Sequence, residues 1–411
     1  MAGARPDSRA PALDAFIVAA SAPRSAHPTG DLAEAEAILA AHPEVAGDVY
    51  AAAILGDADT VRRLLAEDPA CATARGGPYG WDALTYLCFS RYLRLRGGDG
   101  FVRAAEALLD AGADAGTGFF EPAHQPAPTF ESALYGAAGV AHHAGLTRLL
   151  LARGADPNAG GEVAYHAPEG FADGAMQAVV ESGRLTASGL ATMLHRKLDW
   201  TDLRGVRWLL AHGADPNAVS AWGDRALHHS LARDNRLELL EALLDFGADP
   251  SLPAPNHAGR GAVAVAARVG RADALELFAR RGFAVGLDGD DAFFAALARA
   301  DRAGADAFLV AEPGIVDRLE SAQPGFVATL AGAGNTAAVA LALDLGFPPA
   351  DEALSLAVWR GRAETVRLLL ARGAPVSASV LSLAERALTE DSEWTPHRSH
   401  EIIDALRARP G

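Results

Sequence analysis

Histidine is the residue type that most invites a catalytic or metal-binding interpretation of this sequence. The chain has 13 histidines but only 2 cysteines, and imidazole binds transition metals and exchanges protons near neutral pH. Two pairs are adjacent, His142-His143 and His228-His229. Neighbours on a helix point about 100° apart, so the two members of a pair cannot both enter one small site. A zinc or iron site made of histidines from separate segments is the alternative, but the spacings match no metal motif. The sequence therefore predicts no metal and no cofactor.

Carboxylates next to tryptophan offer a second kind of chemistry. In Trp81-Asp82 and in the run from Asp199 to Asp202, an acid lies beside an indole ring. Such an apolar setting raises the pKa of a carboxyl and suits it to acid–base catalysis. Capping is the competing interpretation, because aspartate accepts hydrogen bonds from the first turn of a helix. The chain lacks the H-E-x-x-H, G-x-x-x-x-G-K-[ST] and G-x-S-x-G motifs and an EF-hand loop. We therefore expect no catalytic residues and favour a protein that is not an enzyme.

Charge and composition exclude several classes of partner. The 411 residues carry a net charge of −16, which disfavours nucleic acid and anionic lipid, because both attract basic surfaces. Half of the residues are hydrophobic, too many for a disordered chain. Two cysteines, Cys71 and Cys88, are too few for a disulfide scaffold. Lys197 is the only lysine, and this preference for arginine is typical of a GC-rich coding sequence.

No segment predicts a membrane span or a signal peptide. No apolar stretch approaches the ~20 residues that a membrane helix needs. The short apolar run from Ala15 to Ala20 follows Asp14 closely, which favours a first helix over a signal peptide. We expect a cytoplasmic protein.

A phrase that recurs along the chain indicates which elements position these side chains. Leu-Leu-x-x-Gly-Ala-Asp begins at Leu108 and again at Leu150, and Gly-Ala-Asp-Pro returns at Gly213 and Gly247. The period is about 33 residues, with insertions, which is typical of a repeat protein. Weaker copies or single glycines continue the period at Gly183, Gly282, Gly314, Gly346 and Gly373.

Each period has the composition of two antiparallel helices and a loop. An Ala-rich stretch such as Ala51–Gly56 comes first, and a Leu-rich amphipathic stretch such as Asp59–Leu65 follows. Small residues let the two helices pack closely, and the Gly after the Leu pair can close the second helix in the left-handed conformation. Asp, Pro and Asn then form a turn. Such a unit cannot bury its apolar faces alone, so the units must stack.

This pattern resembles the ankyrin repeat. The unit of that family carries Thr-Pro-Leu-His at its first helix, and Arg225-Ala226-Leu227-His228 is the nearest counterpart here, with Asp82–Thr85 and Ser132–Tyr135 in the same place. The resemblance, to divergent repeats of bacterial type, implies an all-α solenoid of about eleven stacked helix-turn-helix pairs with short hairpin-like loops. It also implies that His228 hydrogen-bonds backbone between repeats and that Asp82 caps a helix.

The resemblance covers the whole chain as one solenoid but is uneven. Asp31–His42 and Glu401–Arg407 resemble the helices of terminal caps, and atypical ends are expected because the end faces of a stack must be covered. The expected divisions are a divergent N-terminal cap at 1–48, better-matching repeats with loop insertions at 49–250, divergent repeats at 251–376 and a C-terminal cap at 377–411.

Three segments depart from the ideal unit. Residues 90–100 insert either a helix extension with a Gly-rich turn or a protrusion that faces a partner. Residues 116–128 form a long Pro-rich loop, and a first helix is shortened at 162–170. Long loops in compact folds are often functional, so these segments are candidates for binding.

The loops also hold many of the few aromatic residues, which indicates where a partner binds. An ankyrin-like array presents a concave groove lined by loops and first helices, and aromatic rings anchor interfaces. The competing interpretation is that each ring packs on the neighbouring repeat. We expect a non-catalytic protein–protein interaction scaffold with a protein partner of unknown identity. The alternative is a small-molecule-binding or enzymatic protein that uses the groove between residues 79 and 233. The expected partner-binding residues are Tyr79, Trp81, Asp82, Tyr86, Phe120, His124, Tyr165, His166, Trp200, Trp222, Arg225 and His229.

Overall fold

The computed structural model describes residues 9–22, 31–349, 351–389 and 400–408, and most of these residues are helical. Contacts divide the chain into two compact units. Unit 1 comprises Met1–Lys197 and Arg204–Asp215, and unit 2 comprises Leu198–Leu203 and Pro216–Gly411. None of the described helices is long and apolar enough to cross a bilayer.

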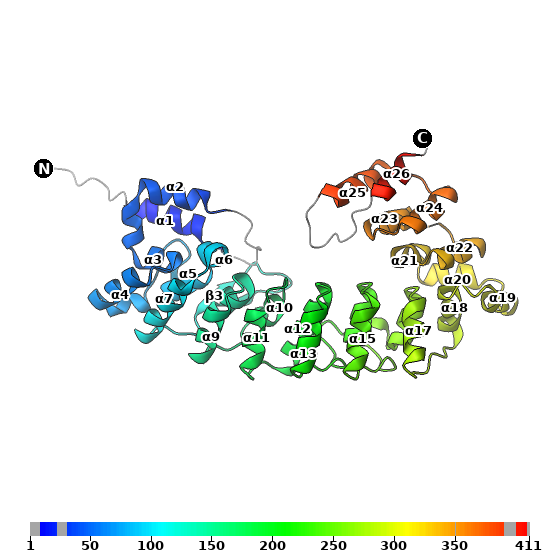
Figure 1. Cartoon of the computed structure of the whole chain (residues 1–411), viewed down its shortest axis with the longest axis horizontal. Helices are drawn as coiled ribbons and strands as arrows, with labels where there is room; N and C mark the ends of the chain where they lie inside the picture. Colours follow the sequence, from blue (N-terminus) through cyan, green and yellow to red (C-terminus); the bar gives the residue numbers. More distant parts are fainter. Residues whose placement is uncertain (1–8, 23–30, 350, 390–399, 409–411) are drawn as a thin grey trace. The chain divides into compact units, whose positions relative to one another are not determined.

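Unit 1 is a succession of helix pairs with two β-hairpins between them (Figure 1). A π-helical turn, Gly136–Val140, follows α8, and 3-10 turns lie at Pro43–Gly47 and Pro69–Ala72. In chain order the elements are α1 (Arg9–Ala20), α2 (Ala33–Ala41), α3 (Val49–Leu55), α4 (Ala58–Glu67), β1 (Arg75–Gly76), β2 (Trp81–Asp82), α5 (Ala83–Cys88), α6 (Arg91–Arg96), α7 (Asp99–Asp110), β3 (Gly118–Glu121), β4 (Thr129–Ser132), α8 (Ala133–Tyr135), α9 (Ala144–Ala152), α10 (Glu162–His166), α11 (Gly174–Glu181), α12 (Ala187–Asp199) and α13 (Leu203–Ala211).

Unit 2 continues the alternation of helices and turns without a named strand in its described part. A 3-10 turn, Pro255–His257, precedes its second helix pair. The helices are α14 (Ala226–Ala232), α15 (Leu237–Asp245), α16 (Ala262–Arg268), α17 (Ala272–Arg280), α18 (Gly289–Ala298), α19 (Arg302–Ala311), α20 (Ile315–Ala322), α21 (Phe326–Ala333), α22 (Thr336–Asp344), α23 (Asp351–Trp359), α24 (Ala363–Ala371), α25 (Ala378–Thr389) and α26 (His400–Arg407).

The glycine of the repeated phrase closes the second helix of a pair, as the sequence predicts. Without a Cβ, glycine adopts the left-handed backbone conformation that ends a helix. Gly314 differs, because its φ is −95° and it lies at the N-terminus of α20 instead of closing a helix. The glycines of the repeated phrase that adopt this conformation, with φ between 84° and 103°, are Gly112, Gly154, Gly213, Gly247, Gly282, Gly346 and Gly373.

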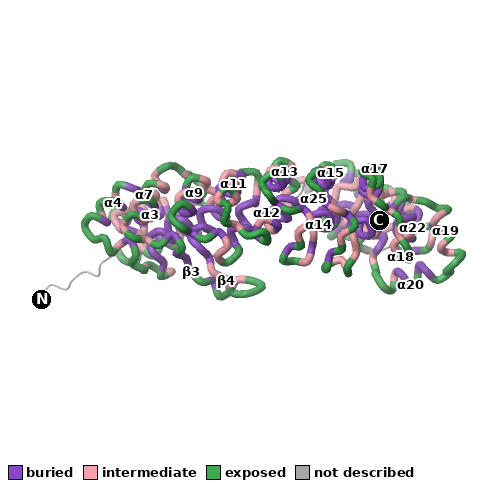
Figure 2. The backbone as a smooth tube through the Cα atoms, turned by 90° about the horizontal axis from the view of Figure 1, so that it is seen from below, coloured by how far each residue is buried: buried purple, intermediate pink, exposed green. Residues whose placement is uncertain are grey.

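Helices of successive pairs pack on one another, first helix on first helix and second on second. Contacts of this kind join α3 to α5, α16 to α18 and α21 to α23 among the first helices, and α4 to α7 among the second. The small side chains of Ala51, Ala52 and Ala53 are fully buried in α3, which permits this close approach. Figure 2 shows the buried residues along the helices and the exposed residues at the loops. The predicted all-α repeat fold is thus confirmed.

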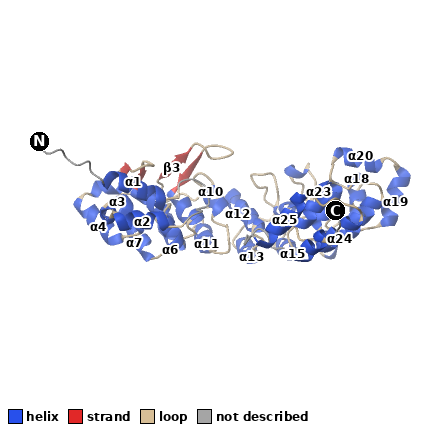
Figure 3. Ribbon diagram, turned by 90° about the horizontal axis from the view of Figure 1, so that it is seen from above, coloured by secondary structure: helices blue, strands red, loops and turns tan. Residues whose placement is uncertain are grey.

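The Pro-rich loop at 116–128 belongs to a β-hairpin. Strands β3 and β4 pair antiparallel, with Phe119 opposite Glu131 and Phe120 opposite Phe130. The hairpin projects from the helices of unit 1 (Figure 3). Gly118 is required at its base, because a Cβ there would lie 2.2 Å from the carbonyl oxygen of Glu131. A smaller hairpin, β1–β2, places Trp81 opposite Gly76.

The insertion at 90–100 forms a separate short helix, α6, and does not continue α5, which ends at Cys88. Ser90 caps α6, and Gly97 ends it. Tyr92 and Leu93 are buried, while Arg96 forms an ion pair with Glu36 of α2 at 2.9 Å. The insertion therefore packs on the N-terminal helices. The shortened first helix at 162–170 is confirmed as the five-residue α10.

Both expected caps contain helices where the structure describes them. Helix α2 packs on α1, and α26 packs on α24 and α25. Residues 1–8 and 23–30 of the N-terminal cap, and 390–399 and 409–411 of the C-terminal cap, lie outside the described residues.

Candidate functional site

The predicted partner-binding residues divide between the two units. Trp200, Trp222, Arg225 and His229 belong to unit 2. The members in unit 1 are Tyr79, Trp81, Asp82, Tyr86, Phe120, His124, Tyr165 and His166.

The predicted aromatic residues around β2 pack inside unit 1. Trp81 is only 4% exposed and stacks on Phe119 of the next hairpin, with ring centroids 4.3 Å apart. The fully buried Tyr86 donates a hydrogen bond to the Gly76 carbonyl at 2.9 Å, and burial raises the pKa of Tyr86 to about 12. Tyr79 is half-buried against Trp81. These rings therefore follow the competing interpretation, in which each ring packs on a neighbouring repeat.

Asp82 has the capping role that the resemblance implies. Its carboxylate accepts a hydrogen bond from the backbone N–H of Thr85 at 2.8 Å and another from the hydroxyl of Thr117. Because Thr117 precedes β3, the buried Asp82 fixes one repeat to the next and is not presented to a partner.

Two predicted aromatic residues are exposed. Phe120 is 62% exposed on β3, and Trp222 is 44% exposed in the turn before α14. Tyr165 is half-buried, because the Arg196 guanidinium lies over its ring at 4.1 Å from the centroid. Phe120 and Trp222 are therefore the predicted residues with the most surface available to a partner.

His166 lies at the centre of a buried row of charges in unit 1. Its Nε2 is 3.2 Å from Glu162 and its Nδ1 is 3.1 Å from Glu169, and Arg196 bonds the same Glu169 oxygen at 2.7 Å. Burial opposes a charge on His166, but the hydrogen bonds to the two carboxylates outweigh it and raise the pKa of His166 to about 9. His166 is consequently a cation at neutral pH, held between two anions.

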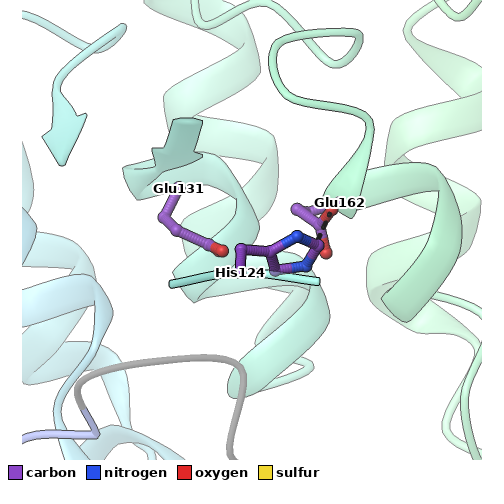
Figure 4. Close-up of side chains that lie close together, drawn as sticks. All are labelled: His124, Glu131 and Glu162. Carbon is purple, nitrogen blue, oxygen red and sulfur yellow. Dashed lines mark ion pairs between the residues drawn. The ribbon is translucent and has the colours of Figure 1, made fainter. Parts of the chain in front are cut away.

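Next to this row, His124 and Glu131 face Glu162 (Figure 4). The Nε2 atom of His124 is 3.7 Å from Glu162, and its Nδ1–H donates to the Ala127 carbonyl at 3.0 Å. Glu131 is fully buried on β4. Burial, followed by the negative charge of Glu162, raises the pKa of Glu131 to about 7.

A further buried ion pair in unit 1 involves Lys197, the only lysine. The ammonium of Lys197 is 2.5 Å from Asp173 and 2.8 Å from the carbonyl of Gly170. Arg204 also reaches Asp173, at 3.2 Å, but its side chain is 75% exposed. Nothing in the residues around Lys197 predicts that it belongs to a site.

Unit 2, which includes Asp199 at the C-terminal end of α12, has its own cluster of histidine and carboxylate. The Nε2 atom of His229 is 2.8 Å from Asp199, and its Nδ1 is 3.9 Å from Asp224. His257 also contacts Asp224, at 2.9 Å. Burial opposes a charge on His229, but the bonds to Asp199 and Asp224 raise its pKa, and the two histidines hold the pKa of Asp224 well below its usual range despite burial. Trp200 is half-buried beside this cluster in sequence.

Arg225 and His228 connect repeats through backbone carbonyls. Arg225 donates to Pro253 at 2.9 Å and to Asn217, so its guanidinium is occupied within unit 2. His228 donates from Nε2 to the Arg260 carbonyl at 2.9 Å, the role that the resemblance implies. Burial and the neighbouring His257 lower the pKa of His228 to about 4, although its bond to Arg260 acts the other way.

The shift at His228 predicts a loss of stability in acid. The folded state holds His228 neutral down to about pH 4, whereas the unfolded chain binds a proton near pH 6.5, so stability falls as the pH drops below 6.5 and the loss is complete below 4. The shift corresponds to at most ~3 kcal/mol. We expect H228Q, which keeps an N–H donor, to lose less stability than the wild type between pH 7 and pH 4.5. Urea denaturation at the two pH values measures the difference, and equal losses in both proteins would contradict the prediction.

Apart from Asp199, which lies beside an indole ring in the sequence, the acidic members of these clusters are not among the residues that the sequence predicts. Glu131, Glu162 and Glu169 come from a strand, a helix start and a loop, and only Glu162 and Glu169 show a signal, since they lie four residues before and three residues after His166. Glu131 directly precedes Ser132–Tyr135, which resembles the family signature. The position of Glu131 is therefore explained by the repeat and gives no separate signal of a site. The His–acid pairs in unit 2 join residues about 30 apart, one repeat period, so a comparison of equivalent positions in successive repeats would find them.

Comparisons with known proteins find a family model and solved structures that are similar to part of this chain. The family model described as ankyrin repeats (many copies) matches residues 194–234. Among solved structures, the chain is similar to the human ASB11 ankyrin repeat domain, at 21% identity and a TM-score of 0.40, over 52% of this chain and 89% of that chain. It is also similar to the ankyrin repeat domain of Bcl-3, a member of the IkappaB protein family, at 19% identity and a TM-score of 0.41, over 53% and 92%. No curated protein matches the chain.

Proposed function

We propose that this chain, whose residues 194–234 match the ankyrin-repeat family model, is a non-catalytic scaffold that binds a partner protein through its loops and hairpins. Ankyrin repeats in general mediate protein–protein interaction. A stacked array supports this role physically, because it holds an extended surface rigid while the loops vary independently of the buried helix faces. The net charge of −16 favours a partner with a basic or mixed face.

The main evidence for this proposal is the exposure of Phe120 on the projecting hairpin. Successive side chains of a strand point to opposite faces, so Phe119 packs on Trp81 while Phe120 points away from it. The 62% exposure of Phe120 leaves most of a large apolar ring in water. Aromatic residues of this kind supply much of the binding energy of interfaces. Trp222 gives unit 2 a comparable exposed ring.

Replacing Phe120 with alanine is expected to weaken partner binding about 30-fold without a loss of fold, because a binding hot spot contributes about 2 kcal/mol. Partners are first identified by affinity purification from the native organism with the full chain as bait. The dissociation constant of each purified partner is then measured for the wild type and for F120A and W222A.

Val310 provides the matched control. Among the described residues it is the most exposed large hydrophobic one, at 84%, and it lies on α19 of unit 2, so V310A should bind as the wild type does. A partner that binds F120A and W222A with wild-type affinity would refute the proposed surface. Trp81 is unsuitable for this test, since its burial means that W81A would report on stability.

A small-molecule or catalytic function remains the second candidate, and the clusters of histidine and carboxylate favour it. In unit 1, His124, Glu131 and Glu162 bring three ligand-type groups together from separate elements. Such convergence is uncommon in a purely structural repeat, because buried charges without partners are unfavourable.

A further inference from the structure

We propose that His124, Glu131 and Glu162 form a binding site for one divalent transition-metal ion. The three side chains come from the β3–β4 loop, from β4 and from the start of α10. Their ligand atoms all lie within 4.8 Å of one another. Donors on opposite sides of an ion with ~2.1 Å bonds are ~4 Å apart, so a small contraction of the cluster would let all three bind one ion and leave its remaining position to water.

The buried carboxylate of Glu131 gives a second observation in favour of a metal ion, independent of the distances between the ligand atoms. Its side chain is 0% exposed, and neither carboxylate oxygen has a hydrogen-bond partner within the described part of the chain. Buried polar groups in proteins are nearly always paired, because an unpaired one loses its hydration without compensation. Pairing of β4 with β3 fixes the backbone of Glu131 opposite Phe119, and the side chain points toward His124 (Figure 4). A cation at this point would compensate the carboxylate.

His124 is oriented as a ligand. Because its Nδ1–H donates to the Ala127 carbonyl, the lone pair is on Nε2, the atom that faces Glu162 at 3.7 Å. A histidine that binds a metal through one nitrogen commonly donates from the other to a backbone carbonyl or carboxylate, which fixes the ring.

The carboxylate of Glu162 is also oriented by a neighbouring side chain. One of its oxygens contacts Nε2 of His166 at 3.2 Å, while the other faces His124. His166 is in turn held by Glu169, and Glu169 by Arg196. This row satisfies the outer side of Glu162 and leaves its inner oxygen directed at the cluster.

The donor set selects the class of ion. One imidazole and two carboxylates suit Zn²⁺, Fe²⁺ and Mn²⁺, whereas Ca²⁺ takes six to eight oxygen ligands. The sequence predicted no metal, because ligands separated by 7 and then 31 residues match no motif and meet only through the hairpin.

Zinc titration of the full chain tests the proposal. After dialysis against a chelator, the protein is titrated with ZnCl₂ at pH 7.5 by calorimetry, and the bound zinc is counted by elemental analysis after gel filtration. We expect one Zn²⁺ per chain, and at least 100-fold weaker binding in both E131Q and H124N. The exposed His212 is the matched control, since H212N should bind zinc as the wild type does.

Stability separates loss of the site from loss of the fold. Without metal, E131Q should unfold at a temperature no lower than the wild type, because the substitution removes a buried unpaired charge. H124N changes a loop side chain and keeps the fold in any case. The proposal is overturned if the wild type binds no zinc, or if E131Q and H124N both bind it with wild-type affinity.

Discussion

Replacing Lys197 with methionine is expected to destabilise unit 1 by about 3–5 kcal/mol. The ammonium is 1% exposed and lies 2.5 Å from Asp173, whose carboxylate is also buried. Methionine fills a similar volume, but among the described residues it leaves Asp173 with the solvent-exposed Arg204 as its ionic partner, at 3.2 Å. A buried carboxylate without adequate compensation is strongly unfavourable, which accounts for the size of the effect.

Arg204 provides the control for this prediction, because it contacts the same carboxylate from water. R204M should lose less than about 1 kcal/mol, as exposed ion pairs contribute little. Urea denaturation measures both variants, and the double variant K197M/D173N should recover part of the loss. Labelling with an amine-directed reagent gives a second readout, since modification of the only lysine requires unit 1 to open. Equal losses in K197M and R204M would contradict the prediction.

Lys197 also shows where sequence reasoning ends. The repeat, its helix pairs and the left-handed glycines follow from local composition and period, because these features are set within a few residues. In the sequence alone, the single lysine indicates only a codon bias. Its partner Asp173 lies 24 residues away in a degenerate repeat, so no local pattern connects the two. A pair of this kind becomes visible only when the stacking of α11 and α12 is known.

The aromatic residues illustrate a related limit. Position in a loop predicts exposure, yet Trp81 and Phe119 stack inside unit 1 while Phe120, one residue on, is exposed. The alternation of a strand decides which ring is buried, and the two-residue and four-residue strands are too short for a periodic signal. The role of Glu131 could not be predicted from the sequence either. Only the register of β4 opposite β3 directs its side chain toward His124.

Replacing Asp234 with asparagine should destabilise unit 2 by roughly 3 kcal/mol and make its unfolding less cooperative. The carboxylate contacts Arg271 at 3.2 Å, Arg360 at 3.1 Å and Arg362. Arg362 lies 128 positions after Asp234 in the chain. Asp234 therefore joins repeats that are not neighbours in sequence. Asparagine tolerates the positive φ of 55° at this position, and therefore the substitution removes the charge without straining the backbone.

The loss of cooperativity follows from the arrangement of a repeat protein. In a stacked array each repeat contacts only its neighbours, and distant repeats can unfold separately. Arg360 and Arg362 on Asp234 add a contact between distant repeats, so unit 2 should unfold as one body while this contact holds. D234N is expected to lower both the urea midpoint and the slope of the transition. D245N is the matched control, because Asp245 pairs with Arg281 at 2.8 Å on the surface and its removal should change stability by less than about 1 kcal/mol. An unchanged slope in D234N would show that nearest-neighbour contacts alone hold unit 2 together.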